Sequence, residues 1–215
     1  NEGKPNNFKG TTFYPKIKVN GEMQPVVFQT EKMSCPFGVS EALDSDGNPT
    51  GKYQLNMTFK DMATNEKLSK MYEKIQELDQ HLMNELKTHK DQIAFLKGKK
   101  DNKMAVLLEE GYSCILKQST STSGSYPDFI KVKVYRSDDN KFTGRAALAS
   151  DRQTQVNIFE KLTKMSHAVS IITLSAIYVV KNNIYPVLKL NNVLIYPAPR
   201  YGEYDFDMSD DDNNS

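Results

Sequence analysis

The sequence predicts a mainly β fold with an α-helical insertion: an antiparallel barrel of five to six strands, one long amphipathic helix and a disordered acidic tail. Three observations lead to this prediction. Several segments alternate apolar and polar residues as strands do, one segment of about thirty residues has the helical period, and carboxylates gather in the last thirteen residues. A closed barrel is expected because it buries one face of every strand and removes exposed strand edges.

The first strands are expected between residues 25 and 59. The segments "PVVFQT" (25–30) and "MSCPFGVS" (33–40) look extended, and "DSDGNPTG" (44–51) is a dense turn signal. The next segment, "KYQLNMTF" (52–59), alternates strictly, which predicts a half-buried strand. Its apolar face carries Tyr53, Leu55, Met57 and Phe59.

Residues 65–96 predict a long amphipathic helix, because apolar residues recur there at steps of three and four. These residues are Leu68, Met71, Ile75, Leu78, Leu82 and Leu86. The stripe lacks a sustained heptad, so we expect the helix to pack on a sheet. A second short helix is expected at 104–110, after "KGKKDNK" (97–103). The lysines of 97–103 could contact phosphates, but a solvated helix end is the favoured interpretation.

The second half of the chain returns to strands. "DFIKVKVYR" (128–136) alternates, with Ile130, Val132 and Val134 on one face, and "SDDNK" (137–141) then turns the chain into "FTGRAALA" (142–149). Residues 169–180 and 184–196 predict a long hairpin around an Asn-Asn turn.

The expected organisation has three parts. Residues 1–24 form an N-terminal extension, residues 25–200 form the barrel domain with its helical insertion at about 62–110, and residues 201–215 form the acidic tail.

Charge is distributed unevenly along the chain. The formal net charge is +1, but six of the 27 carboxylates lie in residues 203–215, so residues 1–202 carry 28 basic and 21 acidic residues, a net charge of about +7. This asymmetry suggests a polyanionic partner for the body and an interaction role for the tail. A solubilising end is the alternative. The candidate partner-binding residues of the tail are Glu203, Asp205, Phe206, Asp207, Asp210, Asp211 and Asp212.

No catalytic, cofactor-binding or metal-binding pattern is present. The sequence lacks phosphate-loop, dinucleotide-binding, zinc-protease and serine-hydrolase motifs, so we expect no enzyme activity and no cofactor. Two cysteines and three histidines show no zinc-ligand spacing and favour a reducing, intracellular compartment. No apolar run approaches the roughly 20 residues that cross a bilayer, so no membrane partner is expected.

Aromatic and basic residues alternate on strand 128–136 and recur in the final hairpin. Single-stranded nucleic acid is bound by cations that contact phosphates and by aromatic faces on which bases stack. The candidate nucleic-acid-binding residues are Phe129, Lys131, Lys133, Tyr135, Arg136, Lys141, Phe142, Arg145, Tyr178, Lys181, Tyr185 and Lys189. The alternative is that the aromatic residues fill the barrel while the lysines keep its surface solvated.

Four segments carry a resemblance to a known family: "EEGYSCILKQS", "YPDFIKVKVY", "NKFTGRA" and "IYVVKNNIYPVLKLNNVLIY". Together with the acidic tail they resemble the single-stranded DNA-binding proteins of short-tailed phages, and the second half resembles related proteins of nucleocytoplasmic large DNA viruses. The resemblance covers about residues 25–212. In the tail, Tyr204 and Phe206 precede the last aspartates and the chain ends in Asn-Asn-Ser, which departs from the phage pattern of a terminal aromatic.

The resemblance implies an oligonucleotide-binding (OB) barrel that holds single strands without sequence preference during DNA replication, recombination and repair. It also implies that the tail competes for the cationic cleft and recruits replication proteins such as polymerase or helicase, that the protein is a homodimer, and that it acts in the host cytoplasm or nucleus at sites of viral DNA replication. Two alternatives stay open: a protein-interaction or virion structural module, and a single-stranded RNA binder on the same barrel.

Overall fold

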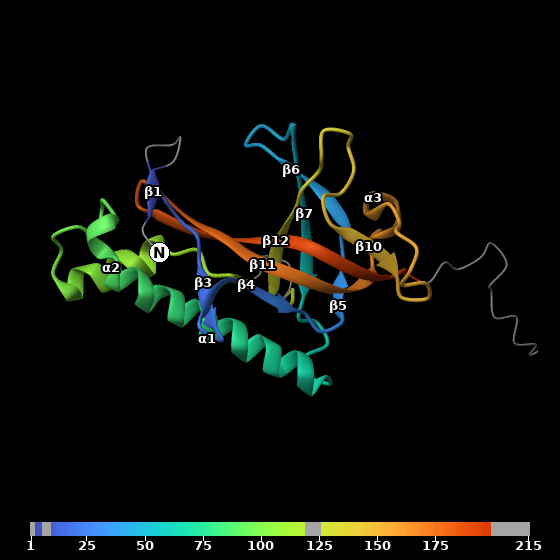
Figure 1. The fold of residues 1–215 in the computed structure, drawn as a ribbon, viewed down its shortest axis with the longest axis horizontal. Coiled ribbons are helices and arrows are strands. Elements are labelled where there is room, and N and C mark those ends of the chain that lie inside the picture. The colour runs from blue at the N-terminus through green and yellow to red at the C-terminus, as the bar shows by residue number, and fades with distance from the viewer. Residues whose placement is uncertain (1–2, 6–9, 119–125, 199–215) are drawn as a thin grey trace, which may run out of the picture.

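The structure is a computed structural model that describes residues 3–5, 10–118 and 126–198 (Figure 1). Its helices are α1 (Glu66–Thr88), the 3₁₀ helix η1 (Lys90–Gln92), α2 (Asp101–Gly111) and α3 (Ile158–Lys161). Its strands are β1 (Lys4–Pro5), β2 (Thr11–Phe13), β3 (Lys16–Val19), β4 (Glu22–Gln29), β5 (Met33–Cys35), β6 (Val39–Leu43), β7 (Pro49–Thr58), β8 (Leu116–Lys117), β9 (Phe129–Val134), β10 (Arg145–Leu148), β11 (Ser166–Val180) and β12 (Asn183–Tyr196).

Five strands close into a ring in the order β11, β5, β7, β9, β12 and back to β11. The mainly β fold and the single long helix are therefore confirmed. The expectation of an antiparallel barrel is wrong at β12, which runs parallel to β9 and to β10. Side-chain alternation reports which face a residue occupies and carries no information on the direction of the neighbouring strand. The described part of the chain also holds more strands than the five to six expected, since twelve join the sheet.

The hydrophobic core combines buried residues of this ring with buried residues of α1 and α2, and the predicted alternation of two strands is confirmed. Leu55 and Met57 of β7 are fully buried, and so are Ile130 and Val132 of β9. These two strands pair antiparallel, with Leu55 opposite Val132 and Asn56 opposite Lys131. Lys131 and Lys133 therefore point away from the core, because neighbouring residues on a strand face opposite sides.

Part of the first 24 residues pairs with β11, the first strand of the final hairpin. β2 lies against β11, with Phe13 opposite Ile177, and β3 and β4 form a hairpin whose second strand also pairs with β11.

The long helix begins where it was predicted to begin, and it ends eight residues before the predicted end at residue 96. The Asn65 side chain accepts a hydrogen bond from the Leu68 amide at 3.2 Å, which caps the start of α1. The helix then stops at Thr88. Beyond η1, Ile93 and Leu96 lie in irregular turns and are fully buried. These apolar residues extended the helical pattern in the sequence, but they pack in the core without being part of a helix. Figure 1 shows α1 lying along one side of the sheet.

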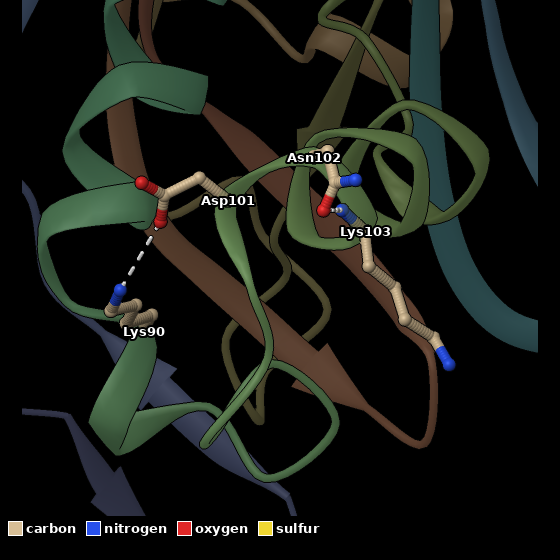
Figure 2. Close-up of polar contacts among 4 residues, drawn as sticks. All are labelled: Lys90, Asp101, Asn102 and Lys103. Atoms are coloured by element: carbon tan, nitrogen blue, oxygen red, sulfur yellow. Dashed lines mark hydrogen bonds and ion pairs between the residues drawn. The ribbon is translucent and has the colours of Figure 1, made fainter.

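The predicted second helix is present as α2. Lys90 Nζ lies 3.4 Å from Asp101 Oδ1, an ion pair that joins η1 to the first residue of α2, and Figure 2 shows Lys103 extending away from this pair. The lysine-rich segment 97–103 thus includes the start of α2, where Lys103 is exposed.

The final hairpin is formed by β11 and β12, and its turn differs from the predicted one. Val180 pairs with Asn183, so Lys181 and Asn182 make the turn and Asn183 already belongs to a strand. Lys181 adopts a left-handed conformation with φ of 54°. Two β-bulges interrupt the pairing, one at Ile171/Ile172 and one at Leu174/Ala176. The expected hairpin at 137–149 is reduced to one bridge between Arg136 and Phe142, after which β10 pairs with β12.

Candidate nucleic-acid interface

A groove of about 750 Å³ opens beside the turn end of the β11–β12 hairpin. β9 pairs with β12 at Leu188 and Lys189, and the β12 residues from Tyr185 to Leu188 line the groove on this side. The α2–β8 connection closes the far end, because the Ser113 amide donates to the Ile184 carbonyl at 2.9 Å. The lining residues are Ser113, Lys117, Lys131, Lys133, Tyr178, Val180, Tyr185, Pro186, Val187 and Leu188.

The charged side chains that line this groove among the described residues are all cations. They are three lysines, Lys117 of β8 and Lys131 and Lys133 of β9, and no described lining residue is a carboxylate. Burial lowers the pKa of Lys133, and the nearby ammonium of Lys52 on β7 lowers it further. Burial also lowers the pKa of Lys117, while Cys114 and the Asp79 carboxylate oppose this shift and Lys131 adds to it. The lysines therefore repel one another in a partly desolvated site, and a bound anion would relieve that repulsion.

Tyrosine side chains lie beside these cations. Tyr178 and Tyr185 are directly opposite each other on β11 and β12, so both side chains are on one face of the hairpin. Lys133 Nζ lies 5.8 Å from the centre of the Tyr178 ring. Lys189 Nζ lies 5.6 Å from the Tyr135 ring in the same way. Tyr135 and Tyr185 keep 40% and 44% of their surface exposed, which leaves ring area for a ligand to stack on.

A buried carboxylate holds one wall of the groove in place. Asp79 of α1 accepts hydrogen bonds from the Tyr112 hydroxyl at 2.8 Å, the Ile115 amide at 2.8 Å and the Leu116 amide at 3.2 Å. Burial raises the pKa of Asp79, and these three hydrogen bonds oppose the rise. The bonds tie the helix to the segment that carries Ser113 and Lys117. Sequence reasoning missed Asp79, although an acidic residue on the apolar stripe of an amphipathic helix was an available signal.

The structure brings together several of the predicted site residues. Lys131, Lys133, Tyr178 and Tyr185 line the groove. Four more predicted residues lie beside it. Tyr135 and Lys189 form the second lysine–tyrosine contact, and Lys181 is exposed in the hairpin turn. Phe129 is half-buried and lies on the same face of β9 as Lys131. Sequence reasoning did not select Lys52 and Lys117.

Three predicted residues have other partners. Arg136 lies 4.3 Å from the Tyr53 ring and 4.2 Å from the Phe159 ring, and it donates to the Tyr53 hydroxyl at 2.8 Å. Lys141 forms an ion pair of 2.8 Å with Asp139. Phe142 is half-buried against the core.

Arg145 lies in a different groove. Its guanidinium Nη2 donates to the backbone carbonyls of Arg152 and Gln153, both at 3.1 Å, and it helps to line a hollow of about 370 Å³ on β10, β11 and β12. The predicted tail residues 203–215 lie outside the described residues.

Among the described residues, no helix is long and apolar enough to span a bilayer, and no group of three or more His, Cys, Asp and Glu side chains is placed to hold a metal ion.

Comparisons with known proteins give a structural resemblance alone. No protein-family model matches the sequence, and no curated protein matches it. The fold resembles the crystal structure of gp2.5, a single-stranded DNA-binding protein encoded by bacteriophage T7, at 8% sequence identity. The match covers 89% of this chain and 98% of that chain with a TM-score of 0.39. At this level of similarity the functional assignment has to come from the groove. The resemblance to proteins of large DNA viruses stays a prediction.

Proposed function

We propose that this chain is a sequence-independent single-stranded DNA-binding protein without catalytic activity, which protects unwound strands during DNA replication, recombination and repair. One observation carries the proposal: among the described residues, three lysines and two tyrosines line one groove and no carboxylate does. Lysines in such a groove neutralise phosphates, and tyrosine rings stack on unpaired bases of any sequence. Stacking contributes about 1–3 kcal/mol per base, so the two rings would add affinity without adding sequence preference.

The proposed fold assignment is an OB-fold-like barrel. The ring of five strands, with parallel and antiparallel pairs, supports this assignment. OB folds are five-stranded, partly open barrels that bind oligonucleotides on one outer face. The groove likewise lies on the outer side of β9, opposite the buried Ile130 and Val132.

The acidic tail has two proposed roles. Its six carboxylates, which follow a body of net charge about +7, would compete with phosphates for the lysine groove. In the presence of DNA they would be released to recruit replication proteins such as polymerase or helicase. A homodimer and an intracellular location at sites of DNA replication belong to the same proposal.

The test is fluorescence anisotropy of a labelled oligo-dT strand across a salt series. Wild type should bind at low salt, with log affinity falling as log salt rises. The double substitution Lys131→Ala/Lys133→Ala should weaken binding and reduce that slope by about 1.4, at about 0.7 for each phosphate that is no longer neutralised.

Lys103→Ala is the matched control. Lys103 is exposed on α2, outside the groove, and should leave the affinity and slope unchanged (Figure 2). If the double substitution binds like wild type, these lysines do not neutralise phosphates. Tighter binding of oligo-U than of oligo-dT would favour the RNA alternative, and no binding to either at low salt would favour a protein-interaction module.

A further inference from the structure

A second groove lies on the outer face of the hairpin, nearer the end of β12. It crosses four strands at one level: Gln29 of β4 is opposite Ile171 of β11, Ile171 is opposite Asn192 of β12, and Asn192 is opposite Arg145 of β10. Its lining also includes Arg152 and Tyr196. The function proposed for the first groove does not use this groove.

The two grooves occupy the same face of the sheet. Thr173 of β11 is opposite Lys189, and Lys189 is opposite Lys133, which lines the first groove. Thr173 and Ile171 are two residues apart on a strand, so their side chains point the same way. The row that contains Lys133 and Lys189 is therefore followed directly by the row that contains Asn192 and Arg145. A single extended ligand could cross from one row to the next without turning around an edge.

The second groove is also positive and aromatic. In the part of the chain that the structure describes, Arg145 and Arg152 are its charged lining residues and no carboxylate lines it. The loop that presents Arg152 is shaped by Asp151, whose carboxylate accepts from the Gln153 and Thr154 amides. At the end of the groove, Lys32 Nζ lies 4.4 Å from the centre of the Tyr196 ring.

The grooves along α1 differ in charge, although one of them adjoins the second groove at Gln29. The grooves along α1 contain carboxylates, among them Glu31 and Glu85, together with histidine or lysine side chains. A polyanion would meet mixed charges there and only cations in the two grooves on the hairpin face. Electrostatics therefore directs an anionic strand to the hairpin face.

We propose that the second groove is a further binding site for the same single strand, in which Arg145 and Arg152 contact phosphates and Tyr196 stacks on a base. This inference rests on the proposed function of the first groove. The strand would enter at Tyr178 and Tyr185, pass Lys189 and reach Asn192. Seven residues of β11 separate Tyr178 from Ile171, a distance of about 23 Å at about 3.3 Å per residue.

The distance between the grooves sets the length of strand that can occupy both. A stacked strand rises about 3.4 Å per nucleotide along its axis, so at most about seven nucleotides bridge the gap, and fewer do so if the strand is extended with its bases unstacked. A four-nucleotide strand would occupy the first groove alone, whereas a sixteen-nucleotide strand would reach both. Strand length therefore separates the contributions of the two sites.

The experiment compares labelled dT4 and dT16 with wild type, Arg145→Ala/Arg152→Ala and Arg152→Ala, by anisotropy across a salt series. The double substitution should weaken dT16 binding several-fold, reduce its salt slope by about 1.4, and leave dT4 binding unchanged. Arg152→Ala should reduce the slope by about 0.7. It spares the hydrogen bonds of Arg145, which go to the backbone carbonyls of Arg152 and Gln153, so it separates phosphate binding from loop stability.

Lys131→Ala/Lys133→Ala should weaken both dT4 and dT16, which distinguishes the two grooves. The inference is overturned if neither arginine variant changes dT16 binding, or if dT4 and dT16 lose affinity equally in folded variants. If wild type binds neither strand, the proposed function itself fails.

Discussion

At the scale of single residues, Tyr185 separates stacking from hydrogen bonding. It is the most exposed tyrosine of the first groove and lies opposite Tyr178. We expect Tyr185→Ala to weaken oligo-dT binding by about 1–3 kcal/mol, the usual contribution of one stacked base, while Tyr185→Phe keeps most of the affinity. Anisotropy titrations at one salt concentration measure both. An equal loss in the two variants would assign the hydroxyl, and not the ring, to binding.

Asp79 is a second residue whose role can be measured alone. Asp79→Ala leaves the Tyr112 hydroxyl and the Ile115 and Leu116 amides without their acceptor inside the protein. Unpaired buried donors are costly, so we expect the free energy of unfolding to fall by about 3 kcal/mol, measured by urea denaturation. Oligo-dT affinity should fall as well, because Lys117 lies directly after the released amides. A variant with wild-type stability would show that Asp79 does not hold the segment that carries Ser113 and Lys117 in place.

The raised pKa of Asp79 also makes a prediction about pH. Because burial raises the pKa above its ordinary value of 3.8, the folded state binds more protons than the unfolded state between the two values. The contribution of Asp79 to the free energy of unfolding should therefore decrease as pH rises from about 4 through the raised pKa. Asp79→Asn removes this titration, so the difference between wild type and Asp79→Asn in urea denaturation should shrink over the same pH range. A difference independent of pH would contradict the prediction.

At the scale of elements, two strands pair one after the other with the same edge of β12. β9 pairs with it at Leu188 and Lys189, and β10 takes over from Asn192 onward. Gly144 lies at the changeover, where a β-carbon would collide with the Asn191 carbonyl oxygen and with the Phe142 ring. We expect Gly144→Ala to destabilise the fold by about 1–3 kcal/mol, as overpacking does, and to lower the unfolding temperature in a thermal melt. An unchanged temperature would show that β10 can shift away.

The elements also show which features a sequence can predict. The alternation of β9 correctly gave Lys131 and Lys133 a common outward face, because the period of two is a property of one strand. The same rule assigns Arg136 to the face of Val134, where it stacks on Tyr53, away from the lysines. Lys117 stands on a strand of only two residues, which is too short to show a period. The parallel direction of β12 and the early end of α1 depend on contacts between distant segments, so neither follows from local pattern.

At the scale of the whole molecule, charge is separated by face and by position in the chain. The described residues that line the two grooves on the hairpin face include cations and no carboxylate, while carboxylates line grooves along α1 and six more occupy residues 203–215. A binding face with this excess of positive charge attracts any polyanion, including the protein's own acidic segment. Attraction of that kind weakens as salt screens it, with a Debye length of about 10 Å at 0.1 M.

This separation predicts the effect of removing the tail. A 1–202 truncation should bind oligo-dT more tightly than the full chain at low salt, and the two affinities should converge as salt rises, because screening removes the competition. A full-length variant with the six tail carboxylates changed to amides should behave like the truncation, which separates charge from chain length. Anisotropy across a salt series measures all three proteins. Equal affinity of the full chain and the truncation at low salt would show that the tail does not occupy the grooves, and would leave recruitment of partner proteins as its proposed role.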